Sequence, residues 1–160
     1  MSMSTLYRIL ALAVCALVAT QAAMHAWGTA GMARWIDQGG VLDKATGEAV
    51  AAGSRPFPEM TGIIVHGMNG MFVIPLVALC LLVVGLVSRL PRAAAAGGAV
   101  LGLVVLQVSL GLLGYTHPLF GLLHGINALV LFTTALYAAR LGRRAPAAAA
   151  SVTADTRVDA

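Results

Sequence analysis

Charged residues are missing from most of this sequence, and the gaps between them are long. The uncharged stretches lie between three flanking pairs: Arg8 and Arg34, Glu59 and Arg89, and Arg92 and Arg140. With 10% charged and 59% hydrophobic residues, the chain is not an ordinary soluble domain. Because about 20 apolar residues cross the hydrocarbon of a bilayer, the first two stretches predict one span each and the third predicts two.

Cysteine is equally scarce. The two cysteines, Cys15 and Cys80, fall inside the apolar stretches, where a free cysteine is expected to pack as a small apolar side chain. Among the few prolines, Pro75 lies inside the second stretch and predicts a kink near Met71.

Four transmembrane helices are therefore predicted, packed as an all-α polytopic membrane bundle. Their expected ranges are about residues 5–27, 61–88, 96–115 and 118–140. Residues 1–144 would form one membrane domain, and the Ala-rich residues 145–160 predict a disordered tail. Residues 28–58 are expected to form an outer loop, in which the apolar pairs that flank the polar run 43–48 predict a small β-hairpin.

Basic residues gather on one side of the predicted bundle. The arginines on the side of the two termini are Arg8, Arg89, Arg92, Arg140, Arg143 and Arg144. The other side carries Arg34, Lys44 and Arg55, which are balanced by carboxylates. By the positive-inside rule, both termini are expected in the cytoplasm of a bacterium, with the chain in its plasma membrane. This topology accounts for the net charge of +4 without a nucleic-acid partner.

A four-residue phrase occurs twice, as His66-Gly67-Met68-Asn69 and as His124-Gly125-Ile126-Asn127. The first and third predicted helices also correspond, because Gly28 follows Gln21 at the same interval as Gly114 follows Gln107. Since both halves begin on the same side, the sequence predicts a parallel internal two-fold repeat about an axis along the membrane normal. Such an axis brings the two histidines to the same depth on opposite sides of the bundle.

Two neutral imidazoles on opposite sides can fill both axial positions of a haem iron. We therefore expect His66 and His124 to be the axial ligands of a b-type haem near the extracytoplasmic face. Gly67 and Gly125 would leave room for the flat macrocycle. The haem would be non-covalent, because the chain has no C-x-x-C-H segment.

Two further histidines, His25 and His117, fall near the outer ends of the predicted helices. They are expected to hydrogen-bond the haem propionates, aided by Arg55 or Arg34. The alternative is that histidines at this level only expose their polar ends to water. A zinc or copper site is less favoured, because no carboxylate or cysteine lies at a ligand spacing. No histidine falls near the cytoplasmic side, which gives no support to a second haem.

Two other interpretations remain open at this point. In a structural or assembly subunit, the His and Asn residues of the repeated phrase would serve only as polar contacts between helices, as would Gln21 and Gln107. A quinone- or haem-modifying enzyme would need a proton-handling group near the iron, for which Glu59 is the candidate.

Histidines in the second and fourth of four helices resemble one half of haem A synthase. The pattern is more similar to a family of small bacterial four-helix membrane proteins with the same Gln/His-x-x-Asn layout. The resemblance covers residues 5–140 and implies His66 and His124 as haem ligands. Ile63 and Gly67 replace the Glu and Arg of the synthase pattern Glu-x-x-His-Arg, so haem A synthesis is not expected. The implied roles are electron transfer or haem handling, with respiratory-chain or haem-pathway membrane proteins, or a second copy of the chain, as partners.

Overall fold

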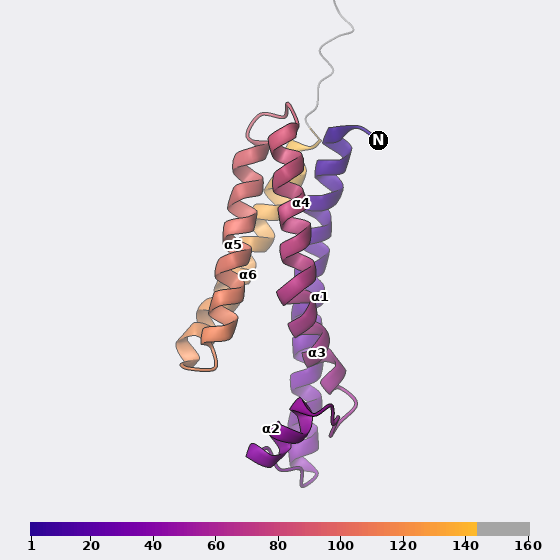
Figure 1. Ribbon diagram of the computed structural model, residues 1–160, viewed down its shortest axis with the longest axis vertical. Coiled ribbons are helices and arrows are strands. Elements are labelled where there is room, and N and C mark those ends of the chain that lie inside the picture. The colour runs from indigo at the N-terminus through magenta and orange to yellow at the C-terminus, as the bar shows by residue number, and fades with distance from the viewer. Residues whose placement is uncertain (144–160) are drawn as a thin grey trace, which may run out of the picture.

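The computed structural model describes residues 1–143, and all the secondary structure in that range is helical. Four long apolar helices could each cross a membrane: α1 (Met3–Asp37), the continuous helix built from α3 (Met60–Met68), η1 (Asn69–Val73) and α4 (Ile74–Val87), α5 (Ala93–Leu113), and α6 (Pro118–Leu141). A short helix, α2 (Lys44–Ala51), lies outside the bundle (Figure 1). The predicted set of four long apolar helices is therefore confirmed. The predicted tail at 145–160 lies outside the described residues.

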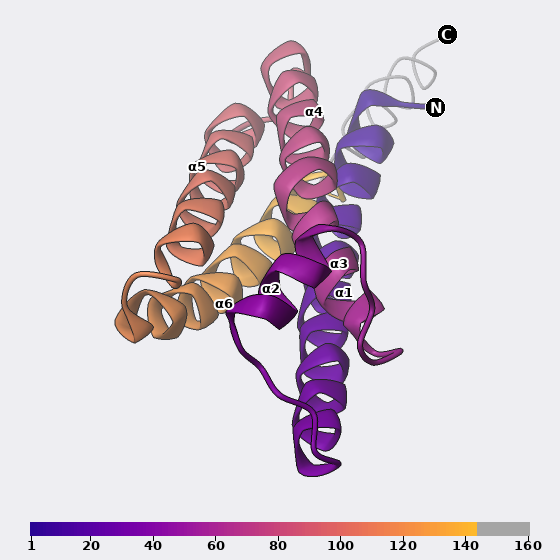
Figure 2. The same cartoon turned by 60° about the horizontal axis from the view of Figure 1, so that its bottom comes forward.

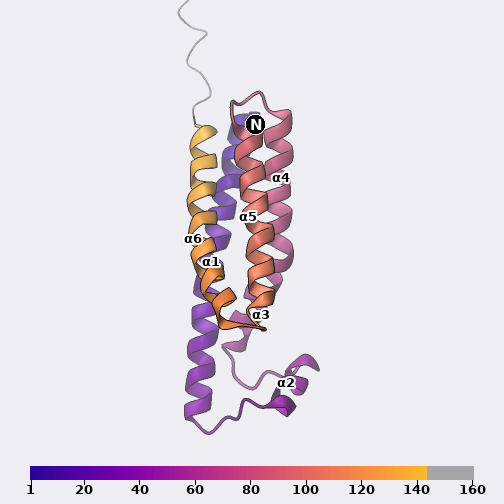
Figure 3. The ribbon, with the colours of Figure 1, turned by 90° about the vertical axis from the view of Figure 1, so that its left-hand side faces the viewer.

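The four long helices form a ring in which α1 contacts α3, α4 and α6, and α5 contacts α4 and α6. The ring consists of two adjacent pairs, α1 with α3–η1–α4 and α5 with α6, which we call the first and second half-bundles. The N-terminus, the α4–α5 connection and the end of α6 lie together at one end, and α2 lies at the other (Figures 1 and 3). Towards the α2 end, α5 and α6 diverge from α1 and α3 (Figures 1 and 2).

The main hydrophobic core fills the end that holds the start of α1 and the end of α6. Tyr7 is fully buried there and donates a hydrogen bond to the backbone oxygen of Ala93 at 2.9 Å, which joins the starts of α1 and α5. Cys15 is buried in this core, as predicted, whereas Cys80 is exposed on the outer face of α4.

Close packing of α1 on α3 brings the two repeated patterns of the first half-bundle together. A Cβ atom at Gly62 would lie 2.5 Å from the backbone oxygen of Met24 and 3.1 Å from the nitrogen of Gly28. Small residues at a crossing let two membrane helices approach to backbone contact. This approach places Gln21 of α1 beside His66 of α3.

The irregularity predicted near Met71 is present as the π-helical turn η1, Asn69–Val73. Pro75 has no N–H to donate to Met71, and its ring would crowd that carbonyl in a regular α-helix. The Ile74 N–H bonds the oxygen of Asn69 instead, five residues earlier. The wider turn keeps Asn69 and Ile74 both buried, five residues apart, where a regular helix would turn one of them away.

Two predictions for residues 28–58 are wrong. The first helix continues to Asp37 instead of ending near residue 27, because α3 covers the helix-weakening Gly28 and Gly31: Ile63 and Glu59 pack directly against them. The expected β-hairpin is the helix α2 instead. Its N-cap is Asp43, whose carboxylate accepts the Thr46 N–H at 2.8 Å, the arrangement that starts a helix rather than a turn between strands.

Candidate functional site

His66 is held by a closed set of hydrogen bonds between α1 and α3. Its Nδ1 lies 3.1 Å from the backbone oxygen of Gln21, and the Gln21 side-chain Nε2 donates back to the His66 backbone oxygen at 3.0 Å. Asn69, one turn further along, donates from Nδ2 to Gln21 Oε1 at 3.2 Å. One glutamine therefore fixes both the ring and the backbone of this histidine.

His124 is held by the same three bonds between α5 and α6. Its Nδ1 lies 2.9 Å from the backbone oxygen of Gln107, whose Nε2 donates to the His124 backbone oxygen at 3.0 Å. Asn127 donates from Nδ2 to Gln107 Oε1 at 2.6 Å, and also to the backbone oxygen of Leu103 at 3.0 Å. The last bond has no counterpart among the described bonds of Asn69.

These bonds determine which nitrogen of each ring carries the proton. A backbone carbonyl oxygen can only accept a hydrogen bond, so Nδ1 of His66 and of His124 must donate. In a neutral imidazole, Nε2 is then unprotonated and keeps its lone pair. No hydrogen bond engages Nε2 of either ring within residues 1–143. Both histidines thus keep a metal-binding nitrogen free, and a bonded second nitrogen orients each ring, as is usual for histidine ligands.

The two anchored rings come together from opposite half-bundles. The ring centroids of His66 and His124 are 6.1 Å apart, with 56° between the ring planes. When two imidazoles bind one metal ion from opposite sides at about 2 Å per bond, their ring centroids are about 6 Å apart. The donor set therefore fits two axial ligands of one metal ion. No group of three or more His, Cys, Asp or Glu residues in the described part of the chain could hold a bare metal ion.

The glycines of the repeated phrase face open space. A Cβ atom at Gly67 or Gly125 would meet nothing within 4 Å. Gly111 of α5 is different, because a Cβ atom there would lie 3.1 Å from Cε1 and 3.2 Å from Nδ1 of His124. Gly111, which the sequence did not single out, leaves the space that the His124 ring occupies.

His25 joins the pair, and His117 does not. The His25 ring packs edge-on against His66, with centroids 5.0 Å apart. Seven residues separate His117 from His124, which in one continuous helix would place His117 above that ring, and the structure does not have this arrangement. His117 precedes Pro118, which forces extended backbone on it. It becomes the N-cap of α6, and its Nδ1 accepts the Leu119 N–H at 3.2 Å.

The two arginines proposed for the propionates lie at different depths. Arg55 donates from Nη1 to Thr61 Oγ1 at 3.2 Å, and Thr61 precedes His66 by about 7–8 Å of helix axis. Arg34 lies on the projecting end of α1, where it lines a hollow with Trp35 and Glu59. It follows Gln21 by 13 residues (34 − 21), which is about 20 Å along the axis. Thr61, the partner of Arg55, lies five residues before His66 and Glu59 seven residues before it (66 − 61 and 66 − 59), whereas Arg34 lies further away along α1.

The residues that the sequence undervalued are the two glutamines. Their side chains bond the backbone, as the sequence led us to expect, since each donates to the backbone oxygen of one histidine. What the sequence did not show is that the backbone oxygen of each glutamine also accepts from Nδ1 of the same histidine. The signal was present in the repeat, because each Gln-to-Gly interval lies on the helix that pairs with a His-Gly-x-Asn phrase.

Comparisons with protein-family models, curated proteins and solved structures found no match for this chain.

Proposed function

We propose that this protein is a multi-pass b-type haem protein of a bacterial cytoplasmic membrane, which holds one non-covalent haem between His66 and His124. The observation that carries the proposal is the pair of anchored imidazoles, 6.1 Å apart, each with Nδ1 bonded to a backbone carbonyl and Nε2 free. This is the protonation state and spacing that bis-histidine iron ligation requires.

The proposal places both termini in the cytoplasm and the histidine pair near the outer surface. Arg8, Arg89, Arg92, Arg140 and Arg143 all belong to the end of the bundle that holds the start of α1, the α4–α5 connection and the end of α6. The α2 end carries a balance of acidic and basic residues. This asymmetry supports the orientation through the positive-inside rule.

The two half-bundles are proposed to be a parallel repeat, and the packing supports this relation. The histidines are 58 residues apart (124 − 66), whereas the buried residues beyond them, Ile74 and Leu131, are 57 apart. The π-helical turn absorbs the one extra residue of the first half-bundle. The interval of 57 continues to Gly85 and Gly142, which pack against the starts of α5 and α1 respectively.

A bound haem would supply one-electron redox chemistry, with its potential set by the axial ligands and their surroundings. The chain's own residues hold the ligands. The backbone oxygens of Gln21 and Gln107 fix the tautomer and ring orientation of the two histidines, so neither ring must reorganise when charge changes at the site. Arg55 is the cation at a suitable depth for a propionate. Because both axial positions are filled from the protein, electron transfer or haem handling is favoured, with respiratory-chain or haem-pathway membrane proteins as partners.

Absorption spectroscopy of the protein purified in mild detergent tests this proposal. We expect a Soret band and the reduced spectrum of six-coordinate, low-spin iron, and loss of both in His66→Ala and in His124→Ala. His117→Ala is the matched control, because its side chain caps its own helix, and should keep the spectrum. A protein that stays colourless after expression with added haem would refute the proposal.

A structural or assembly subunit is the second candidate, and one observation favours it. The Gln, His and Asn side chains already join α1 to α3 and α5 to α6 through interhelical hydrogen bonds, which is how polar residues hold membrane helices together. This function predicts that His66→Ala changes the oligomeric state or partner recovery, while no cofactor is found. It gives no reason for the two free Nε2 atoms.

A further inference from the structure

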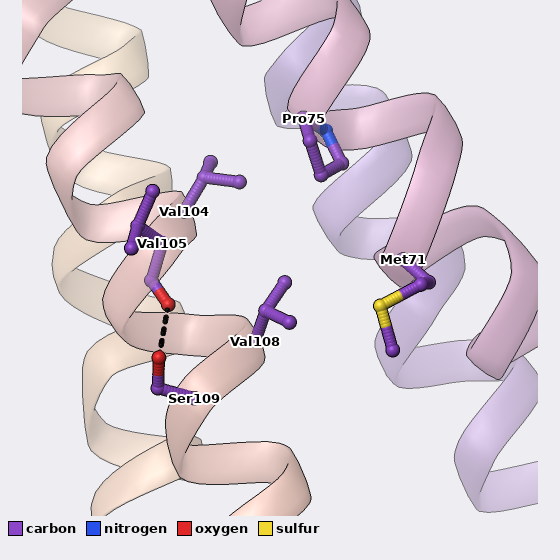
Figure 4. Close-up of a pocket in the computed structure, with 6 residues that line it drawn as sticks. All are labelled: Met71, Pro75, Val104, Val105, Val108 and Ser109. Carbon is purple, nitrogen blue, oxygen red and sulfur yellow. Dashed lines mark hydrogen bonds between the residues drawn. The ribbon is translucent and has the colours of Figure 1, made fainter.

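An apolar groove of about 240 Å³ lies between the second and third membrane helices. Met71 and Pro75 line one wall, and Val104, Val105, Val108 and Ser109 line the other (Figure 4). The only hydroxyl is already engaged, because Ser109 Oγ donates to the backbone oxygen of Val105 at 2.9 Å. The groove therefore offers apolar contact and no free side-chain hydrogen-bonding group.

The groove lies at the boundary between the two half-bundles and extends inward from the level of the two glutamine anchors. Met71 is two residues from Asn69, which is bonded to the Gln21 anchor, and Val108 follows Gln107, the anchor of His124. A flat ligand held between His66 and His124 lies across the line that joins them. Its plane then separates the first half-bundle from the second, and one edge emerges where η1 and α4 face α5.

We infer that this groove receives the methyl- and vinyl-bearing rim of the haem, an inference that rests on the proposed function. The size agrees with a partial enclosure, since sites that surround a whole drug-sized ligand measure roughly 300–1,000 Å³. The chemistry agrees as well, because the lining is apolar on both walls. The propionate edge then points away from the groove, towards the α2 end and Arg55.

The side chains of the groove act as specificity-determining residues in this arrangement. Met71 supplies a flexible thioether that adapts to irregular apolar shapes. Pro75, which follows the π-helical turn, forms the rest of that wall. Val108 lines the α5 wall of the groove. Enlarging Val108 fills the groove without touching either histidine or its glutamine anchor.

The test compares haem binding by Val108→Phe and Val83→Phe, each purified as the full chain. Val83 is exposed on α4 and does not line the groove, so its substitution controls for an added ring in the membrane. We expect Val108→Phe to weaken haem binding roughly tenfold or more, the usual scale of overpacking, and Val83→Phe to leave it unchanged. Circular dichroism and elution volume verify that both variants fold.

A second probe isolates the rim itself. Deuterohaem carries hydrogen atoms where haem b carries vinyl groups, so Val108→Phe should weaken its binding less than it weakens haem b binding. Equal losses for the two porphyrins, or no loss in Val108→Phe, would overturn the inference while leaving the proposed function intact. Failure of the wild-type protein to bind either porphyrin would overturn both. If a lipid chain occupies the groove instead, Val108→Phe displaces co-purified lipid and leaves haem binding unchanged, which also overturns the inference.

Discussion

Replacing each glutamine anchor by leucine should destabilise the protein unequally, although the two sites use the same three bonds. Gln21→Leu and Gln107→Leu each remove two side-chain hydrogen bonds, one to a histidine carbonyl and one from an asparagine amide. Interhelical hydrogen bonds in membrane proteins average about 0.6 kcal/mol each and reach about 1.7 kcal/mol. The loss common to both variants is therefore about 1–3 kcal/mol.

The difference lies in what happens to the asparagine. Asn127 keeps its bond to the Leu103 backbone oxygen at 3.0 Å. Asn69, which is 8% exposed, makes no other side-chain hydrogen bond within the described residues and is left with an unpaired amide. A buried donor without a partner costs about 1–3 kcal/mol. Gln21→Leu should accordingly be less stable than Gln107→Leu by about 1–3 kcal/mol.

Reversible unfolding in mixed detergent micelles, followed by far-UV circular dichroism, measures both free energies. The double variant Gln21→Leu/Asn69→Leu serves as the internal check, because removing both partners also removes the unpaired amide. It should recover part of the stability that Gln21→Leu loses. The reasoning is refuted if the two single variants agree within about 0.5 kcal/mol, the usual scatter of additivity, or if the double variant is less stable than Gln21→Leu.

Two further predictions concern local geometry. Gly111→Ala places a methyl group 3.1 Å from the His124 ring and should shift the Soret band of the haem-loaded protein. Gly102→Ala on the same helix is the control and should leave the band unchanged, because its methyl group meets nothing within 4 Å. Identical spectra for the two variants would contradict the packing at His124. The Thr46 N–H that the Asp43 cap accepts lowers the pKa of that carboxyl below its ordinary value. The contribution of Asp43 to α2 is therefore complete above the ordinary Asp range and is lost as pH falls through the lowered pKa. Carbon-13 NMR of the carboxyl should report a midpoint below that of a model peptide, and a midpoint at or above it would argue against the cap.

The membrane helices could be predicted because one physical term dominates them. An uncharged stretch long enough to cross the hydrocarbon has few alternatives to a helix there. The outer segment is governed by smaller, competing terms. Apolar pairs flank a polar run in residues 41–50, as in a hairpin, yet the Asp43 cap and the Lys44–Glu48 ion pair, 3.7 Å apart across one turn, accompany a helix. Helix α1 continues past Gly28 because α3 packs on it, which no local pattern of α1 records.

In the candidate site, too, one part could be predicted from the sequence and another could not. The opposition of His66 and His124 follows from two phrases at equal depth, and the structure brings these rings together. His117 does not lie above His124 as helical spacing would place it, because it precedes a proline and its backbone is extended. The roles of Gln21 and Gln107 depend on which carbonyl meets Nδ1, and this is decided by helix–helix distance rather than by residue type.

The two half-bundles give chemically similar histidines different surroundings, and this difference matters more than the symmetry. The interval between the two glutamines, 86 residues (107 − 21), also leads from His25 to Gly111 (111 − 25). An imidazole therefore stands beside His66 at the position where a glycine stands beside His124. A ligand held between the two rings would have the His25 imidazole on the His66 side and Gly111, which has no side chain, on the His124 side. If the proposed haem is bound there, this asymmetry distinguishes its two faces, which a symmetric site would leave equivalent.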